Sequence, residues 1–389
     1  MFVTALQLTD FRSYAEVEVA LGPGVSVFTG ANGQGKTNLV EAVEYLSTGA
    51  SHRVSSDAPL VRMGCAQAVA RARVQAGKED ERTILLEVEI TPGKANRARL
   101  NRAPVRLKEI VGALRTVVFS PADLAIVRGD PADRRGFLDG LVITRWPRMA
   151  GVKADYERAL RQRNALLKSI AGKSVHSAGT EAITTLEVWD EQVARFGAEL
   201  LHARLDTLAE VIPHAQAAYA TIAPVNNQIS ASYRASCDLG DAHTQADVRE
   251  ALSARLLEAI GERRRDELAR GVSLVGPHRD EVVLGIGELP AKGYASHGES
   301  WSLALALRLG GFQLLRADGI EAVLVLDDVF AELDTTRRER LAEAIASAEQ
   351  VLVTAAVGAD VPDFLAGRRF VVANGTVTEQ VTSDGGDDG

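Results

Sequence analysis

The residues best suited to chemistry form one glycine-rich stretch that ends in a lysine and a threonine. It fits the pattern G-x-x-x-x-G-K-T without a gap: Gly30, Ala31, Asn32, Gly33, Gln34, Gly35, Lys36 and Thr37, with Asn38 next in the chain. Glycines let successive backbone N–H groups turn toward phosphate oxygens, the lysine brings a positive charge, and the threonine offers a hydroxyl to Mg²⁺. The pattern therefore predicts a phosphate-binding loop for a nucleoside triphosphate.

The segments on either side of this loop are those that it requires. Val25 to Thr29 is a short β-branched and aromatic run typical of a strand, and Asn38 to Leu46 continues as a helix. A helix that starts at Lys36 also directs the positive end of its dipole at the phosphates. A glycine-rich hairpin that merely permits a tight turn is the alternative, but the strand and helix favour the phosphate-binding loop.

A second candidate site lies far along the chain, where Val323 to Leu326 is a hydrophobic strand followed by Asp327 and Asp328. A buried parallel strand is apolar throughout, and an acid at its carboxyl end lies beside the phosphate-binding loop in such sheets. We expect Asp327 to hold Mg²⁺, directly or through water, and Asp328 to orient or deprotonate the attacking water. Two acids after a strand are otherwise common in solvated turns.

Two helix starts carry further candidate residues. Ser296 and Gly298 precede an apolar helix and offer a hydroxyl and bare N–H groups to an anion. Asp334 closes a short loop before a helix that begins at Thr335. We expect these three residues to bind the nucleotide. An ordinary helix cap is the alternative interpretation at both places, and Asp334 can cap its helix as well as contact the nucleotide.

The elements that must position these residues indicate an α/β protein. Apolar alternation predicts paired strands within Phe2 to Val19 and an antiparallel pair at Ala66 to Val74 and Thr83 to Ile90. Nearly every periodic segment between Asp130 and Leu268 is helical, with an interruption at Pro213 and a short extended piece at Gln228 to Tyr233, and strand patterns return from Val272. We therefore expect a discontinuous nucleotide-binding head of residues 1–130 and 269–389 around an inserted helical lobe of residues 131–268.

Composition narrows the class of protein. The 389 residues are 46% hydrophobic, no stretch of eighteen apolar residues occurs, and the N-terminal residues lack the pattern of a signal peptide. Two cysteines, Cys65 and Cys237, form neither a disulfide framework nor a metal-ligand spacing. We therefore expect a cytoplasmic protein without a membrane partner.

The charge is unevenly distributed. The net charge of -8 argues against indiscriminate binding to polyanions, but residues 94–108 are basic and contain no acid, whereas residues 383–389 form an acidic, glycine-rich tail that we expect to be flexible. The basic segment is a candidate DNA-binding surface, with a solvated hairpin as the competing interpretation. Its arginines are Arg97, Arg99, Arg102 and Arg106.

The order of these features resembles the ATP-binding-cassette family and, within its SMC-like branch, the RecF family. The matching stretches span most of the chain and leave mainly the helical lobe and the tail unmatched. They are Leu8 to Tyr14 (L-T-D-F-R-S-Y), the phosphate-binding loop, Ser51-His52-Arg53, Phe119 to Leu124 (F-S-P-A-D-L), Gly129 to Arg135 (G-D-P-A-D-R-R), Gly276 to Asp280 (G-P-H-R-D) and Leu326 to Asp334 (L-D-D-V-F-A-E-L-D).

The resemblance implies an ATPase head with a mixed β-sheet core that binds ATP and Mg²⁺. It also implies a homodimer, in which Ser296 and Gly298 of one protomer close on the nucleotide of the other. A RecF-like role would be in DNA repair and replication, on gapped or junction DNA, with RecR- and RecO-like mediators and a recombinase to be loaded. The activity would be a weak, DNA-stimulated ATPase.

Two departures from the cassette pattern affect the expected rate of ATP hydrolysis. Glu299-Ser300 replaces the Gly-Gln of many cassettes, so only Ser296 and Gly298 transfer cleanly. Thr354-Ala355-Ala356 stands where many cassettes place a histidine that senses the γ-phosphate. We therefore expect slow hydrolysis.

Other functional classes fit less well. The nucleotide-binding subunit of a transporter is the main alternative, but the opening strands, the inserted lobe and the Ser296 turn favour the RecF-like interpretation. A DNA-tethering relative would need a longer insertion with sustained heptads. A small-molecule kinase would leave the Ser296 turn and the Asp334 loop unexplained.

Overall fold

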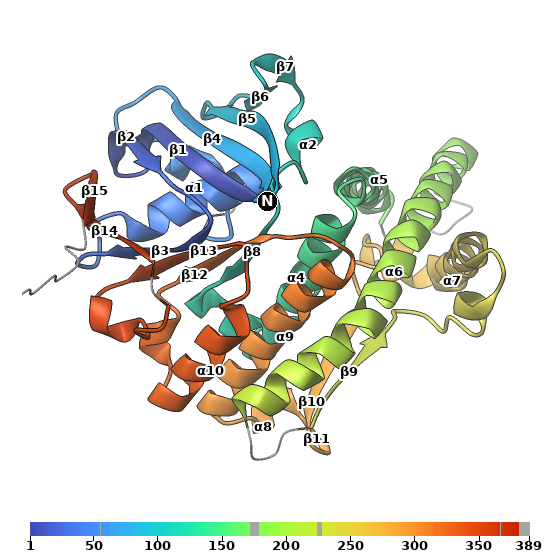
Figure 1. The fold of residues 1–389 in the computed structure, drawn as a ribbon. Helices are drawn as coiled ribbons and strands as arrows, with labels where there is room; N and C mark the ends of the chain where they lie inside the picture. The colour runs from blue at the N-terminus through green and yellow to red at the C-terminus, as the bar shows by residue number, and fades with distance from the viewer. Residues whose placement is uncertain (55, 172–178, 224–227, 366, 381–389) are drawn as a thin grey trace, which may run out of the picture. The chain divides into compact units, whose positions relative to one another are not determined.

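The chain forms two units, each assembled from segments that are distant in sequence (Figure 1). The computed structural model describes residues 1–54, 56–171, 179–223, 228–365 and 367–380. Among these, the first unit takes residues up to 123, 217–223 and those from Leu305 onward, and the second takes 124–216 and 228–304. The second unit thus holds most of the expected helical lobe, together with residues 124–130 and 269–304.

A mainly parallel sheet forms one layer of the first unit. Its six strands run in the order β15-β14-β3-β13-β12-β8, and only β15 is antiparallel to its neighbour. Val323 to Leu326 in β12 are fully buried, as an apolar run in a central parallel strand requires. The strands are β3 (Gly24–Thr29), β8 (Thr116–Phe119), β12 (Val323–Asp327), β13 (Gln350–Ala355), β14 (Arg368–Ala373) and β15 (Thr376–Gln380).

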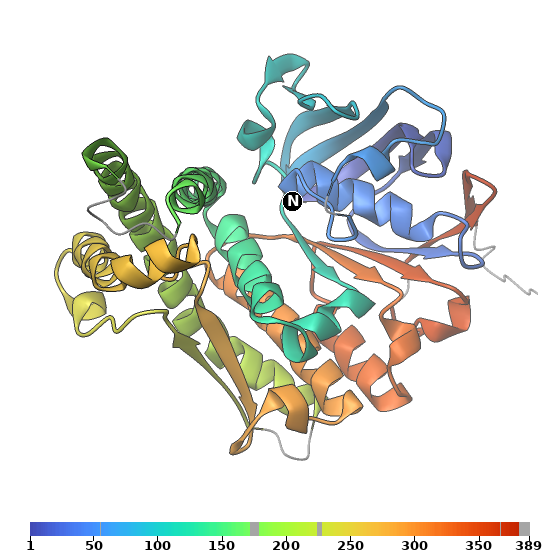
Figure 2. The ribbon, with the colours of Figure 1, turned by 180° about the vertical axis from the view of Figure 1, so that it is seen from behind.

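An antiparallel sheet with the order β2-β1-β4-β5-β6-β7 forms the other layer. Helix α1 (Lys36–Thr48) contacts strands of both sheets and lies between them, in blue in Figure 2. Its buried Leu39 and Leu46 join one hydrophobic core with side chains of both sheets, so the helix that follows the glycine loop is fixed from two sides. The strands are β1 (Phe2–Phe11), β2 (Tyr14–Ala20), β4 (Ala68–Gly77), β5 (Asp80–Ile90), β6 (Arg97–Leu100) and β7 (Ala103–Val105).

The second unit is mainly helical, with one small antiparallel sheet of order β11-β10-β9. A buried ion network stabilises it, in which Arg163 donates to Asp190 at 2.7 Å and to Glu267 at 2.6 Å. Such a buried cation is tolerated because both carboxylates pair with it. The main elements are α4 (Pro131–Arg145), α5 (Met149–Ser169), α6 (Thr180–Ile222), α7 (Val248–Arg270), β9 (Ile229–Arg234), β10 (Glu281–Ile286), β11 (Leu289–Pro290) and α9 (His297–Ala317), and the chain passes between units within α6 and α9.

One helix differs from the sequence expectation, because α6 continues through Pro213, where the periodic pattern suggested an interruption. Proline removes one helical hydrogen bond, at a cost of about 3 kcal/mol in an isolated helix. Val211 and Ala215, on either side of Pro213, are fully buried, as is Tyr219 in the next turn. Packing of this face therefore outweighs the local penalty.

Most other expected elements are confirmed, including the extended piece near residue 230, which is β9. Asn374 and Gly375 have positive φ angles of 50° and 75° and form the tight turn between β14 and β15. The acidic tail at 383–389 lies outside the described residues. No helix in the described part of the chain is long and apolar enough to span a membrane.

Candidate nucleotide site

The glycine loop follows β3 and ends at α1, as its pattern requires. Gly30, Gly33 and Gly35 have positive φ angles of 153°, 84° and 108°. A Cβ on Gly30 would lie 2.3 Å from the Val372 carbonyl oxygen, and one on Gly35 would lie 2.7 Å from Ser13 Oγ. The loop therefore needs glycine both for its backbone conformation and for the close approach of its neighbours.

Lys36 is held against the loop. Its Nζ donates to the carbonyl oxygens of Gly30 at 2.8 Å and Ala31 at 3.3 Å, and to Asn32 Oδ1 at 3.5 Å. The residue is only 4% exposed, so its charge is concentrated where the loop closes. An ammonium group in this place can exchange these neutral acceptors for the oxygens of a bound phosphate.

The structure brings the first predicted acid to the end of the loop. The Thr37 hydroxyl donates to Asp327 Oδ1 at 2.9 Å, and the Thr354 hydroxyl donates to the same oxygen at 2.6 Å. Asp327 ends β12, which pairs with β13 so that Asp327 and Thr354 lie opposite each other. The carboxylate is 6% exposed and oriented by two hydroxyl groups.

These oxygen atoms fit Mg²⁺. The described residues contain no cluster of three or more His, Cys, Asp or Glu side chains able to hold a metal ion by themselves. Mg²⁺ at phosphate sites keeps several waters and takes only one or two protein ligands besides phosphate oxygens. Because Thr37 donates its proton to Asp327, the lone pairs of its oxygen stay available to a cation.

Asp328 has an unusual backbone and an unusual carboxyl group. Its φ is 52°, in the left-handed region, and its N–H donates to the Thr354 hydroxyl at 3.0 Å and carbonyl at 3.2 Å. Its Oδ1 is buried and has no hydrogen-bond partner among the residues that the structure describes. Burial and the charge of Asp327 raise the pKa of Asp328, and the charge of Lys36 opposes them. A carboxylate with a raised pKa is the better proton acceptor.

Neighbouring segments support the loop. Tyr14 Oη donates to the Gly35 carbonyl at 3.1 Å, and Asn38 Nδ2 donates to Ser13 Oγ at 3.0 Å. The side chain of Gln34 accepts from the backbone N–H of Asn374 at 2.8 Å. The β1–β2 turn and the β14–β15 turn thus brace opposite parts of the glycine loop.

One charged cluster beside the loop was not found from the sequence. Glu41, fully buried on α1, accepts from Arg12 Nε at 2.9 Å, from Arg53 Nη1 at 3.0 Å and from Ser51 Oγ. Burial acts to raise the pKa of Glu41, but the bonds from Arg12 and Ser51 and the charge of Arg53 hold it below its usual value. Two guanidinium groups on one carboxylate leave a net positive charge near the start of α1. The sequence signal that could have predicted this cluster is an acidic residue, Glu41, within the apolar pattern of α1.

Ser296 and Gly298 lie in the second unit, at the start of α9. Ser296 Oγ accepts from the Glu299 N–H at 3.2 Å, and the Glu299 carboxylate accepts from the Ser296 N–H at 2.9 Å. This reciprocal pair is a capping box, so the ordinary role of the turn is present. The serine hydroxyl acts as acceptor here, which leaves its proton available for an anion.

Asp334 likewise caps a helix. It precedes α10 (Thr335–Ile345) and accepts from the Arg337 N–H at 2.9 Å. Its carboxylate also pairs with the Arg337 side chain at 2.9 Å. The geometry accounts for this residue by helix capping, and a contact with nucleotide remains an expectation.

The basic segment forms the β6–β7 hairpin and the start of α2 (Leu107–Ile110). Arg97 pairs with Glu89 at 3.3 Å and Arg99 pairs with Glu87, both across to β5. Arg102 lies in the hairpin turn with a φ of 70°, and Arg106 precedes α2. Arg102 and Arg106 are exposed, and their side chains make no ion pair within the described residues. They are therefore the more available cations.

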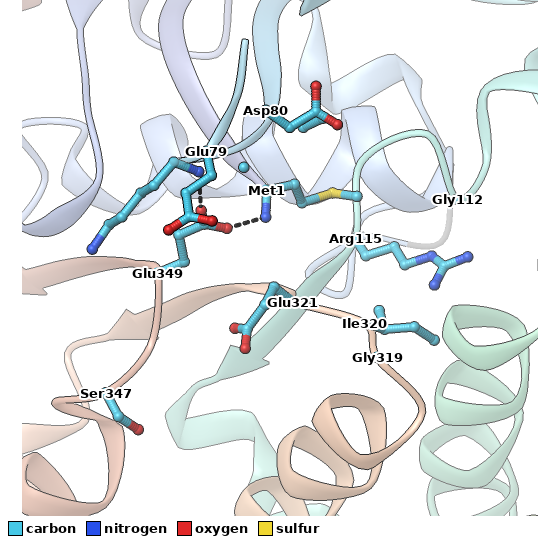
Figure 3. A pocket seen from close by; sticks show the side chains of 13 residues that line it. Met1, Glu79, Asp80, Gly112, Arg115, Gly319, Ile320, Glu321, Ser347 and Glu349 are labelled. Atoms are coloured by element: carbon cyan, nitrogen blue, oxygen red, sulfur yellow. Dashed lines mark hydrogen bonds and ion pairs between the residues drawn. The ribbon is translucent and has the colours of Figure 1, made fainter. Parts of the chain in front are cut away.

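A pocket of about 630 Å³ lies elsewhere in the first unit (Figure 3). Its walls include Arg115, Glu321 and Glu349, which come directly or almost directly before β8, β12 and β13. These are the amino ends of the parallel strands, whereas the glycine loop and the two acids follow the carboxyl ends. The pocket is therefore distinct from the nucleotide site.

Comparisons with known proteins agree with one family. The family model described as "RecF/RecN/SMC N terminal domain" matches residues 2–361. The chain is 63% identical over 386 residues to the DNA replication and repair protein RecF of Cutibacterium acnes, with 97% of this chain and 98% of the relative covered. It is 60% identical over 378 residues to RecF of Streptomyces avermitilis, with coverage of 97% and 99%.

Solved structures give the same result. The recombination mediator protein RecF bound to ATPrS, described as part of the RecFOR pathway, superposes with a TM-score of 0.84 at 26% identity, with 98% of both chains covered. An Smc head bound to a winged-helix domain of ScpA superposes with a TM-score of 0.55 at 16% identity, over 98% of this chain and 97% of that one. The second likeness concerns the fold alone.

Proposed function

Because the chain belongs to the RecF family of DNA replication and repair proteins, within the SMC-like ATPases, we propose that it is an ATP-dependent DNA-binding protein of recombinational repair and replication-fork maintenance. The convergence of the glycine loop with the paired acids supports the ATP-dependent part most directly. Thr37 and Asp327 come from distant parts of the chain and lie 2.9 Å apart. Beside a triphosphate, such a hydroxyl and carboxylate can hold Mg²⁺.

Each residue has a role in this proposal. The N–H groups of residues 30–38 and the Lys36 ammonium hold the phosphates, and Thr37 and Asp327 are the groups that would hold Mg²⁺. When bound, the metal would neutralise negative charge that develops on the phosphate oxygens. Asp328 orients a water molecule or accepts its proton as that water attacks the terminal phosphate.

A second copy of the chain completes the site. Ser296 and Gly298 of that copy close on the nucleotide, so ATP promotes dimerisation and hydrolysis reverses it. Asp334 also contacts the nucleotide. The capping box at Ser296 supports this role because it leaves a hydroxyl proton and helix N–H groups at the start of α9. The histidine of many cassettes is replaced by the Thr354-Ala355-Ala356 segment, and turnover is accordingly slow.

The DNA-related part rests on the family and on the basic segment. Its RecF relatives are named for replication and repair, and a RecF structure is described in the RecFOR pathway. The chain acts in the cytoplasm on gapped or junction DNA, with RecR- and RecO-like mediators, and promotes recombinase loading. Arg102 and Arg106 contact phosphates, with Arg97 and Arg99 in supporting positions. A transporter subunit, the alternative function, receives no support from these relatives.

Equilibrium binding of ATP and steady-state turnover, with and without gapped DNA, test this proposal. We expect binding in the presence of Mg²⁺, a turnover below about 10 s⁻¹, the median of enzymes, and an increase on adding DNA. Lys36→Met should abolish turnover, whereas Lys78→Met, an exposed lysine of the β4–β5 turn, should not. Absence of ATP binding by the native chain would refute the proposal.

A further inference from the structure

Thr354 lies in the strand between the two strands that carry the glycine loop and the paired acids. It lies in β13, which pairs with β12 on one side and with β3 on the other. Asp327 is its partner in β12 and Phe28 its partner in β3, the strand that leads to the glycine loop. Thr354 itself is fully buried. A change of its side chain therefore affects the strands that carry both parts of the site.

The Thr354 hydroxyl contacts both acids. It donates to Asp327 Oδ1 at 2.6 Å and accepts from the Asp328 N–H at 3.0 Å. A hydroxyl group can do both at once because it has one proton and two lone pairs. No aliphatic side chain of the same shape can replace it.

The contact with Asp328 holds a strained backbone. A non-glycine residue in the left-handed region persists only where its surroundings enforce that conformation. The Asp328 N–H is shared between the hydroxyl and the carbonyl of Thr354, at 3.0 and 3.2 Å. These two bonds fix the direction in which the chain leaves β12, and hence the place of the Asp328 carboxyl group.

We propose that Thr354 is a positioning residue for the ATPase site, which orients the Asp327 carboxylate toward Mg²⁺ and holds Asp328 in its left-handed conformation. The inference rests on the proposed ATPase function. It gives the threonine a specific part in the reaction, at the end of the strand where many cassettes carry a histidine. Thr37 provides the second hydroxyl on Asp327, at 2.9 Å, so loss of Thr354 leaves that carboxylate only half constrained.

The test compares Thr354→Val, which removes the hydroxyl and keeps the shape, with Thr354→Ser, which keeps the hydroxyl. In the full-length chain we expect valine to lower kcat by about 10- to 100-fold and to raise the Mg²⁺ concentration for half-maximal turnover by about tenfold, as is typical for partners of metal ligands. Because serine keeps the hydroxyl, its kcat and its Mg²⁺ concentration for half-maximal turnover should each stay within about threefold of the native values.

A second readout separates positioning from general damage. Binding of a fluorescent ATP analogue without Mg²⁺ should be unchanged in the valine variant, while the gain in affinity on adding Mg²⁺ should shrink. Thr354→Ala, which also lacks the hydroxyl and has a smaller side chain, replaces the valine variant if that one does not fold.

Several outcomes would overturn the inference. One is a folded valine or alanine variant with native turnover and native Mg²⁺ dependence, and another is a serine variant as impaired as the valine variant. Both would leave the proposed function intact, provided that the native chain binds and hydrolyses ATP. A native chain that binds no ATP would overturn both proposals.

Discussion

The Thr37 hydroxyl donates a 2.9 Å hydrogen bond to Asp327, which lies 290 residues further along the chain. This contact joins the first turn of α1 to the end of β12. It explains how the two acids, unremarkable by themselves, come to lie beside the glycine loop once the parallel sheet has formed. The Thr37–Asp327 contact is thus the junction on which binding of Mg²⁺ would depend.

Asp327→Asn tests the junction. Asparagine keeps the size of the side chain and its hydrogen-bonding oxygen but removes the charge, so we expect Mg²⁺-dependent turnover to fall by about 100-fold, the upper part of the range for metal-site changes. Binding of ATP without Mg²⁺ should persist, because Lys36 and the loop are untouched. Asp247→Asn is the matched control for stability, because Asp247 caps α7 by accepting from the Glu250 N–H at 3.1 Å and asparagine caps helices as well as aspartate. Undiminished Mg²⁺-dependent turnover in Asp327→Asn would contradict the assignment.

Gly30→Ala tests the glycine loop. The added Cβ would lie 2.3 Å from the Val372 carbonyl oxygen, so β14 or the loop must move. We expect a loss of stability of about 1–3 kcal/mol, typical of overpacking, and weaker ATP binding, measured by denaturant unfolding and by titration.

Gly136→Ala is the control, because Gly136 is exposed within α4 and no heavy atom lies within 4 Å of the added Cβ. Alanine there should be neutral or stabilising by about 0.5–1 kcal/mol. Equal effects of the two substitutions on ATP binding would show that the loop has no special steric requirement.

The sequence predicted the parts of the site that depend on local pattern. The glycine loop, β12 with its acids and the capping residue Asp334 each have a short, ordered signature. The role of Thr354 depends on strand register between β12 and β13, which no local pattern records. Arg97 and Arg99, which were predicted as candidate DNA-binding residues, pair with acids of β5 that only the sheet brings near.

The secondary structure was likewise predictable where it depends on local pattern. Strands and helices with clear periodicity were identified, whereas the continuation of α6 through Pro213 was not. There the burial of Val211, Ala215 and Tyr219 overrides a local signal. The Arg12 and Arg53 pair on Glu41 was missed because it needs three segments to meet.

Arg102→Ala with Arg106→Ala tests the DNA-contacting surface. If about six phosphates are neutralised, affinity should drop by about 10³-fold between 50 and 200 mM salt. Each lost phosphate contact should reduce the slope of log affinity against log salt by about 1, so the double variant should lose about 2. Arg82→Ala, an exposed arginine paired with Asp80, serves as control and should leave the slope unchanged. Native salt dependence in the double variant would remove these two residues from the surface.

His278 should make the second unit sensitive to acid. Its Nδ1 accepts from the Tyr156 hydroxyl at 2.7 Å, and burial lowers the pKa of His278 from 6.5 to about 4. Above pH 6.5 the side chain is neutral in both folded and unfolded chains. As the pH falls below 6.5, the unfolded chain takes up the proton first, so stability declines until about pH 4.

The expected size is about 2 kcal/mol between pH 7.5 and pH 5, from about 1.4 kcal/mol for each pH unit below 6.5. Urea unfolding of the native chain and of His278→Gln at both pH values isolates this contribution, because other groups titrate in both proteins. The native chain should lose about 2 kcal/mol more than the variant over this interval. Parallel losses in the two proteins would mean that His278 is not buried in its neutral form.

In the proposed function, the glycine loop is half of a site that a second copy of the chain completes. Analytical ultracentrifugation with and without ATP and gapped DNA tests it directly, on the native chain, Lys36→Arg and Asp328→Asn. We predict that the native chain dimerises on ATP, that Lys36→Arg dimerises weakly or without turnover, and that Asp328→Asn stays dimeric because it binds ATP and does not hydrolyse it. A mass that is independent of nucleotide in all three proteins would contradict the claim.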